Sequence, residues 1–168
     1  MTRIRKHGAS VDVTKLGGVE IVPFSGQSVS VVGSITQNGV VKQSVVVTLT
    51  AAQIIAMGTT PVSLIAAPGA GKCIIVDNIS FKMTTTATVF TGGGAVEFRY
   101  TNASGTKVTA DIAAAVITAV AGVSFTNVRG IEALLTGTVD AAIVIRNATA
   151  AFAAGTGSAV VTIDYHVV

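Results

Sequence analysis

The sequence predicts an all-β protein: a β-sandwich or jelly-roll-like body with one or two short helical turns and an extended N-terminal arm. Apolar and polar residues alternate with a period of two over several segments of the 168-residue chain, which is typical of half-buried strands. Short runs rich in Gly, Ser, Thr and Asn separate these segments, as turns do. Because little of the chain favours helix, two packed layers of short strands are the expected architecture.

The first 43 residues differ from the rest because their apolar pieces are short and are interrupted by glycines and a proline. Asn38-Gly39 suits a two-residue hairpin turn. Residues 1–43 are therefore expected to form either a small hairpin layer or an arm that lies on a neighbour, and residues 44–168 the sandwich domain. Arg3, Arg5 and Lys6 make the N-terminus a basic tail. Such a tail can contact phosphate, acidic lipid or an acidic protein groove, or it can simply be solvated. The candidate partner contacts are Arg3, Arg5, Lys6, Val19, Ile21 and Phe24.

A strand followed by a short helix opens the body. Ser44–Thr50 is rich in Val and Thr and predicts a strand. Thr50 is a good helix N-cap, and Gln53 stands three residues later, as in a capping box. We expect a helix over Ala51–Met57 that ends at Gly58 and covers one end of a sheet.

The stretch Val62–Met83 predicts the central element of the core. It contains a strand, a tight Pro-Gly turn and a longer strand, in an arrangement that resembles a hairpin. In the second strand Ile79, Phe81 and Met83 alternate with polar residues, so these three side chains are expected to face the core.

The remaining elements follow from the same reasoning. In Ala95–Tyr100, the residues Val96, Phe98 and Tyr100 share one face, while Glu97 and Arg99 share the other, either solvated or pairing across strands. The other expected elements are a short helical turn near Asp111 followed by a strand or irregular crossover, weaker strands at Ser124–Val128 and Glu132–Leu135, a strong strand at Val139–Arg146, a loop at Asn147–Gly157 and a final strand at Ser158–Val168.

The composition indicates surfaces that are not bathed in water. Half of the residues are hydrophobic and 11% are charged, against about 25% charged in a typical soluble domain. No apolar run reaches the roughly 18 residues of a membrane-spanning helix. Such a chain is expected to bury faces against its own copies or a larger assembly, the alternative being a compact domain with a Ser/Thr surface. No signal peptide is predicted, so synthesis in a cytoplasm is expected.

No residue pattern predicts catalysis, a metal or a cofactor. Ala67–Cys73 resembles a phosphate-binding loop, but that loop needs Gly where Ala66 stands, a hydroxyl where Cys73 stands, and a helix afterwards. The lone Cys73 allows no intrachain disulfide and is expected to be buried. His7 and His166 have no metal-ligand spacing. Aromatic residues make up 5% and Trp is absent, so no stacking platform for nucleic acid is expected.

Several turns with their flanking residues form a recognisable pattern: Leu49–Ile54, Thr60–Ile65, Ala67–Lys72, Thr91–Gly94, Phe98–Thr101 and Gly105. In this pattern, which covers roughly Val47–Val168, the chain resembles small proteins encoded in the structural regions of tailed bacteriophages and prophages. Residues 1–43 fall outside the resemblance. The resemblance implies a virion component with a β-sandwich body, and specifically a capsid decoration (cement) protein.

The expected function is therefore structural. The protein would be a homotrimer on the outside of a phage head, in contact with the major capsid protein, where it bridges shell subunits against the pressure of packaged DNA. Alternatives are a tail, neck or head-fibre-base component, and a carbohydrate-binding module for host attachment. The carbohydrate alternative needs exposed aromatic side chains, and the candidates are Phe24, Phe90, Tyr100, Phe125, Phe152 and Tyr165.

Overall fold

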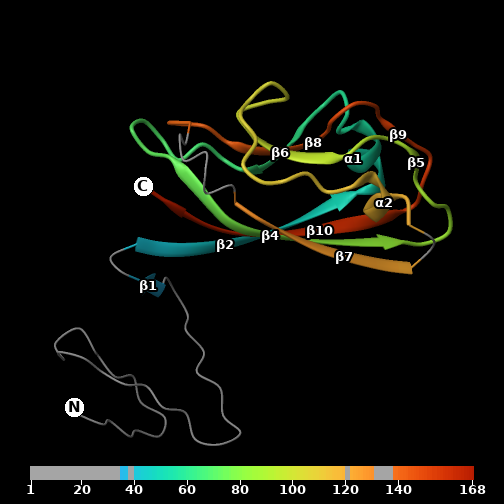
Figure 1. The fold of residues 1–168 in the computed structure, drawn as a ribbon, viewed down its shortest axis with the longest axis horizontal. Coiled ribbons are helices and arrows are strands. Elements are labelled where there is room, and N and C mark those ends of the chain that lie inside the picture. Colours follow the sequence, from blue (N-terminus) through green and yellow to red (C-terminus); the bar gives the residue numbers. More distant parts are fainter. Residues whose placement is uncertain (1–34, 38–39, 120–121, 131–137) are drawn as a thin grey trace, which may run out of the picture. The chain divides into compact units, whose positions relative to one another are not determined.

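The computed structural model describes residues 35–37, 40–119, 122–130 and 138–168, and Ile35–Val168 form one compact unit, here called the sandwich body. Its two main layers face each other (Figure 1). The all-β sandwich prediction is confirmed, while the jelly-roll-like arrangement stays a prediction. One layer has the strand order β1 (Ile35–Gln37), β2 (Val40–Thr50), β10 (Gly157–Val167), β4 (Ile74–Thr85) and β7 (Gly122–Arg129). The other has the order β3 (Val62–Ile65), β8 (Ile143–Asn147) and β6 (Val96–Tyr100).

All strand pairs in these sheets are antiparallel. A further antiparallel pair, β5 (Thr91–Gly92) and β9 (Phe152–Ala153), lies at the end of the body where the helices α1 (Ala51–Ala56) and α2 (Ala114–Ile117) are found (Figure 1). The two short helices agree with the predicted one or two helical turns.

The core lies between the two layers, and the predicted alternation places its side chains. Ile79, Phe81 and Met83 of β4 are fully buried, as predicted. They join buried residues of the opposite layer, among them Phe98 of β6 and Ile145 of β8, in one continuous cluster. Long strands with one apolar face therefore suffice to fix which side of each sheet points inward.

The N-terminal end of the body begins inside the segment 1–43. Gln37 pairs with Val40, so β1 and β2 form the hairpin that Asn38-Gly39 predicts, although these two residues lie outside the described part of the chain. The first residues of β2 also pair with β10, with Lys42 opposite His166. Residues 35–37 and 40–43 thus belong to the sheet of the body. The structure does not describe residues 1–34, so the prediction of an N-terminal arm is not tested for them.

Helix α1 has the predicted capping box. The Thr50 hydroxyl accepts a hydrogen bond from the Gln53 backbone N–H at 3.3 Å, and the Gln53 side chain accepts one from the Thr50 N–H at 2.9 Å. These bonds satisfy backbone donors that a helix start leaves unpaired. Ile54 and Met57 are buried, so the helix covers part of the core as expected.

Replacing Thr50 by alanine is expected to lower the free energy of unfolding by about 1 kcal/mol, because the cap acceptor is lost. Urea unfolding followed by circular dichroism measures the change. Thr50→Ser keeps the hydroxyl and is the matched control, which should retain most of the stability. Equal losses in the two variants would contradict a role for the cap.

The prediction that Val62–Met83 resembles a hairpin is wrong. β3 pairs with β8 in one layer, whereas β4 pairs with β10 and β7 in the other. The segment between them crosses from layer to layer, because each strand has its partners in a different sheet. Its turn uses positive φ angles at Gly69 and Gly71, 99° and 77°, which glycine adopts without strain.

Two other predicted elements are displaced. The helical turn begins at Ala114 rather than near Asp111, because Ile112 exchanges two backbone hydrogen bonds with Val96 and is extended there. The strand predicted from Val139 begins only at Ile143. Asp140 interrupts it with φ of 52°, and its carboxylate accepts a bond from the Gly69 N–H at 3.1 Å. The strand predicted at 132–135 lies outside the described residues.

Candidate functional site

The outward-facing side of the five-stranded sheet is the most extensive candidate contact surface of the body. Successive side chains of a strand point to opposite faces, and the buried residues of β2, β10 and β4 fix which face is inward. The residues that alternate with them line up across four strands, for example Thr48, Val160, Lys82 and Phe125 in one row. We call this surface the outer face; it comprises Ser44, Val46, Thr48, Ser158, Val160, Thr162, Asp164, Asn78, Ser80, Lys82, Thr84, Val123, Phe125, Asn127 and Arg129.

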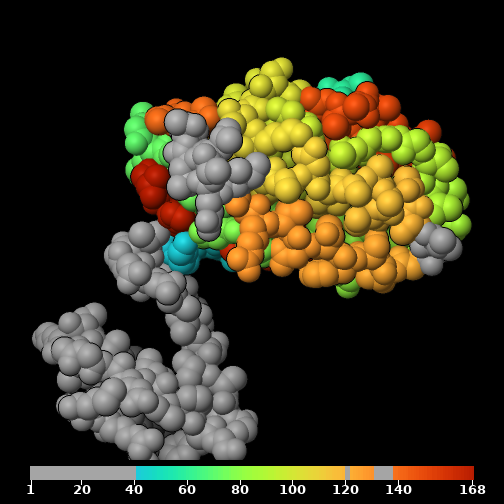
Figure 2. Space-filling view, in the orientation of Figure 1, coloured from blue at the N-terminus to red at the C-terminus, as the bar shows by residue number. Residues whose placement is uncertain are grey.

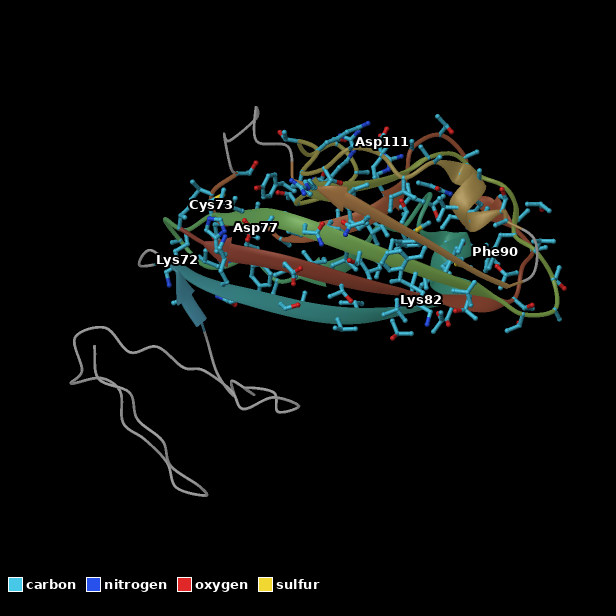
Figure 3. The ribbon with its side chains drawn as sticks, turned by 60° about the horizontal axis from the view of Figure 1, so that its bottom comes forward. Lys72, Cys73, Asp77, Lys82, Phe90 and Asp111 are labelled. Carbon is cyan, nitrogen blue, oxygen red and sulfur yellow. The ribbon has the colours of Figure 1, made fainter. Side chains whose placement is uncertain are left out.

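The outer face combines three charged residues with several exposed apolar side chains. Only Lys82, Arg129 and Asp164 are charged among its members, and none of these forms an ion pair within the described residues. Val46 and Phe125 are 63% and 65% exposed. Lys82 projects from the sheet on this side (Figure 3). Short hydroxyl and β-branched side chains fill most other positions, and their hydroxyl groups would need hydrogen-bond partners in any interface.

Strand β7 forms one edge of this sheet. Among the described residues it pairs along its length with β4 alone, and beyond its end Gly130 forms an isolated bridge with Thr109. Its outward side chains include Val123, 64% exposed, beside Phe125. The atoms of this strand line the lower rim of the body in Figure 2. An edge strand with exposed apolar side chains is a ready place for a partner chain to pack.

A charged cluster covers the outside of the three-stranded sheet. Glu97 is 4% exposed. Its carboxylate accepts hydrogen bonds from Arg99 Nε and lies beside Lys107 Nζ, both at 2.7 Å. Lys107 also donates to Asp111 at 2.8 Å, and Arg99 donates to the Gly105 carbonyl at 2.6 Å. Of the two alternatives left open for Glu97 and Arg99, pairing is therefore observed: Glu97 pairs with Arg99 along β6 and with Lys107, which forms an isolated antiparallel bridge with Arg99.

The titration of this cluster indicates a structural role. Burial alone would raise the pKa of Glu97, but the hydrogen bonds and charges of Arg99 and Lys107 outweigh it and hold this pKa below its usual value. The pKa of Lys107 is raised, first by its bond to Asp111 and then by Glu97. A covered, fully ionised carboxylate between two cations is a poor general acid or base, since it holds its charge at neutral pH. The cluster fastens the 101–113 segment to β6.

The lone cysteine is buried, as expected. Cys73 begins the approach to β4, where Tyr100 donates a hydrogen bond to the Ile74 carbonyl at 2.6 Å. Burial raises the pKa of Tyr100, and the neighbouring Cys73 raises it further. Tyr100 therefore stays neutral, and its hydrogen bond to Ile74 joins the two layers. The strand after Lys72 also confirms that Ala67–Cys73 does not open a helix as a phosphate-binding loop must.

The described residues contain no cluster of three or more His, Cys, Asp or Glu side chains that would hold a metal ion. In this part of the chain no helix has the length and apolar character needed to cross a membrane. The predicted contact residues all lie outside the described part, so the structure does not place them: Arg3, Arg5, Lys6, Val19, Ile21 and Phe24. The outer face was predictable only in part, because alternation marks outward residues but not which strands lie side by side.

No family model matches the chain, and no curated protein matches it either. One solved structure, a chain of the cyanophage Pam1 capsid asymmetric unit, aligns with 86% of this chain and 96% of its own length, at 14% sequence identity and a TM-score of 0.45.

Proposed function

We propose that the protein is a structural component of a phage virion that binds the outside of the capsid and stabilises the shell by bridging capsid subunits. The observation that carries this proposal is the outer face: a continuous sheet surface with Val46, Val123 and Phe125 exposed. A surface of this kind suits packing against another protein. The resemblance of Val47–Val168 to phage structural proteins supplies the kind of partner, the major capsid protein.

The size of the outer face argues for more than one contact. Four strands and about four rows of side chains cover roughly 500 Å². A stable protein–protein interface buries about 800 Å² on each partner. One body would therefore bind weakly by this face alone, and firm attachment needs further contact area, from other copies or another segment.

Residues 1–34 are the proposed second contact. They include Arg3, Arg5 and Lys6, which carry much of the excess positive charge of a chain whose net charge is +3. A segment that reaches one shell subunit while the body rests on another bridges the two. A homotrimer would multiply both contacts around a threefold axis. The binding partner would be the major capsid protein and the location the capsid surface. The protein would be made in the host cytoplasm.

Reconstitution on empty capsids that lack the protein tests this proposal. The full chain is expected to bind to saturation and to raise the temperature at which the shells disrupt. Removing residues 1–34 is expected to weaken binding at least tenfold, which corresponds to about 1.4 kcal/mol, without changing the oligomeric state. The cut belongs at residue 34, because a cut at residue 43 would also remove β1 and the first residues of β2.

A second pair of variants tests the outer face in the same assay. Phe125→Ser with Val123→Ser is expected to weaken binding, whereas Thr106→Ser, an exposed position outside the outer face, is the matched control. If the truncated chain and the Phe125/Val123 variant both saturate capsids like the full chain, neither proposed contact exists and the proposal fails.

The carbohydrate-binding alternative is weaker, because it needs a row of exposed aromatic rings. Phe90, Phe152 and Tyr100 are buried in the core. Tyr165 is partly buried, and Phe125 is the exposed aromatic side chain among the described residues. A tail, neck or head-fibre-base location differs from the capsid location mainly in copy number, which the particle itself would reveal.

A further inference from the structure

Three ionisable side chains from three neighbouring strands meet at one end of the five-stranded sheet. Lys42 Nζ of β2 lies 2.9 and 2.8 Å from the two carboxylate oxygens of Asp77 in β4. His166 Nδ1 of β10 lies 3.1 Å from Lys42 Nζ and 3.2 Å from Asp77 Oδ2. Each group is therefore within hydrogen-bonding distance of the other two.

A local irregularity of β4 produces this meeting. Asp164 pairs with Asn78 and Tyr165 pairs with Val76, so Asp77 is an extra residue without a partner in β10. A bulge of this kind redirects the side chain of the added residue. The Lys42 side chain reaches across β10 to that carboxylate, and His166 stands directly opposite Lys42 in the register. Asp77 lies at the end of the body near Cys73, away from Phe90 (Figure 3).

The three members differ in their freedom to move. The side chain of His166 is 15% exposed, and those of Asp77 and Lys42 are 33% and 39% exposed. His166 is thus held in the central strand, while Lys42 has room to swing into solvent. The charged groups nearest in the register are Asp164 in β10 itself and Arg129 in β7, which is paired with Asn78 of β4.

The geometry allows two hydrogen-bond arrangements that differ by one proton. With a neutral imidazole, Nδ1 accepts from Lys42 Nζ, which also donates to Asp77, and the trio has no net charge. With a protonated imidazole, Nδ1 can only donate, and Asp77 Oδ2 is the acceptor in reach. Lys42 then loses the imidazole acceptor, keeps its contact with Asp77 Oδ1 at 2.9 Å, and faces a positive charge at 3.1 Å. Histidine is the side chain whose charge normally changes between about pH 5 and 8.

We propose that Lys42, Asp77 and His166 form a pH-sensitive latch: protonation of His166 makes the histidine a second cation beside Asp77, weakens the hold on Lys42 and loosens the N-terminal end of β2 from β10. The hairpin formed by β1 and β2 lies at this end of the sheet, where β1 pairs with the first residues of β2. The latch thus affects how firmly the first residues of β2 are held in the sheet. It is a property of the isolated protein and does not depend on the proposed function.

Amide hydrogen exchange of the full chain tests the latch. Protection of residues 42–45, corrected for the intrinsic pH dependence of exchange, is expected to fall about fivefold between pH 8 and pH 5 as the exposed ion pair is weakened. Amides of β4 and β8 serve as internal references and are expected to hold their protection.

Variants identify the group responsible. His166→Gln keeps a side-chain acceptor and cannot be protonated, so its β2 protection should not change with pH in this range. Lys82→Gln removes an unpaired cation from the same sheet face and should respond like the unmodified chain. If His166→Gln shows the same fall as the unmodified chain, or if β2 protection in the unmodified chain stays level or rises on acidification, the latch does not exist.

Discussion

Replacing Phe81 by alanine is expected to lower the free energy of unfolding by about 3–5 kcal/mol, because the ring is fully buried and its removal leaves a cavity. Phe81 lies in β4, opposite Val161 of β10 and Thr126 of β7. The melting temperature should fall by about 10–15 °C in a domain of this size. Chemical denaturation with a thermal melt measures both quantities.

Phe125→Ala is the matched control, since it removes the same kind of side chain from the neighbouring strand. Phe125 stands in β7 next to Thr126, the residue that pairs with Phe81. Phe125 is 65% exposed, so its loss should change the free energy of unfolding by no more than about 0.5 kcal/mol. A loss as large as that of Phe81→Ala would mean that Phe125 is covered in the free protein, and would remove it from the proposed contact surface.

Glu97→Ala is the second change with a large expected effect. It leaves Arg99 and Lys107 without the carboxylate that both contact at 2.7 Å. Stranding fully buried charges costs about 3–5 kcal/mol, but these cations keep some contact with water, so a loss of about 2 kcal/mol is expected. Hydrogen exchange should show the effect concentrated in the 101–113 segment, and a uniform loss throughout the body would argue against a local fastening.

The pKa of Glu97 also predicts how stability depends on pH. This pKa is lower in the folded chain than its ordinary value of 4.5. The stabilisation is therefore fully present above the unfolded value, near neutral pH, and is lost as the pH falls through the folded value. Glu97→Gln has no such titration. The stability difference between the unmodified chain and Glu97→Gln should shrink from pH 6 toward pH 3, and a constant difference would contradict the assignment.

Local rules predicted much of the fold from the sequence. Alternation placed Ile79, Phe81 and Met83 in the core, because the two-residue period of a strand ties each side chain to one face. The capping box at Thr50 and Gln53 located α1, because its hydrogen bonds join residues three positions apart. Signals of this range are fully contained in a short stretch of sequence.

What sequence reasoning missed depends on contacts between distant residues. The Pro-Gly turn after Ile65 looked like a hairpin turn, but strand partners from other parts of the chain draw β3 and β4 into different sheets. Asp140 stops the predicted strand through its bond to Gly69, 71 positions away. Lys42, Asp77 and His166 are scattered in sequence, and a one-residue bulge brings them together. No local sequence pattern predicts that these three side chains lie in contact.

The candidate contact surface was predictable in character but not in position. The low charge content already indicated faces that pack against other proteins. The strand order assembled Val46, Thr162, Ser80 and Asn127 into one row of a continuous surface. This order depends on β10, the last strand, inserting between β2 and β4, which is a property of the whole chain.

The central claim, attachment to the outside of a phage capsid, is tested most directly by cryo-electron microscopy of the intact particle. We expect the sandwich body on the outer capsid surface, repeated with the shell symmetry in hundreds of copies, with the outer face against capsid subunits. Density for the body confined to the tail or neck in tens of copies, or its absence from the particle, would contradict the claim.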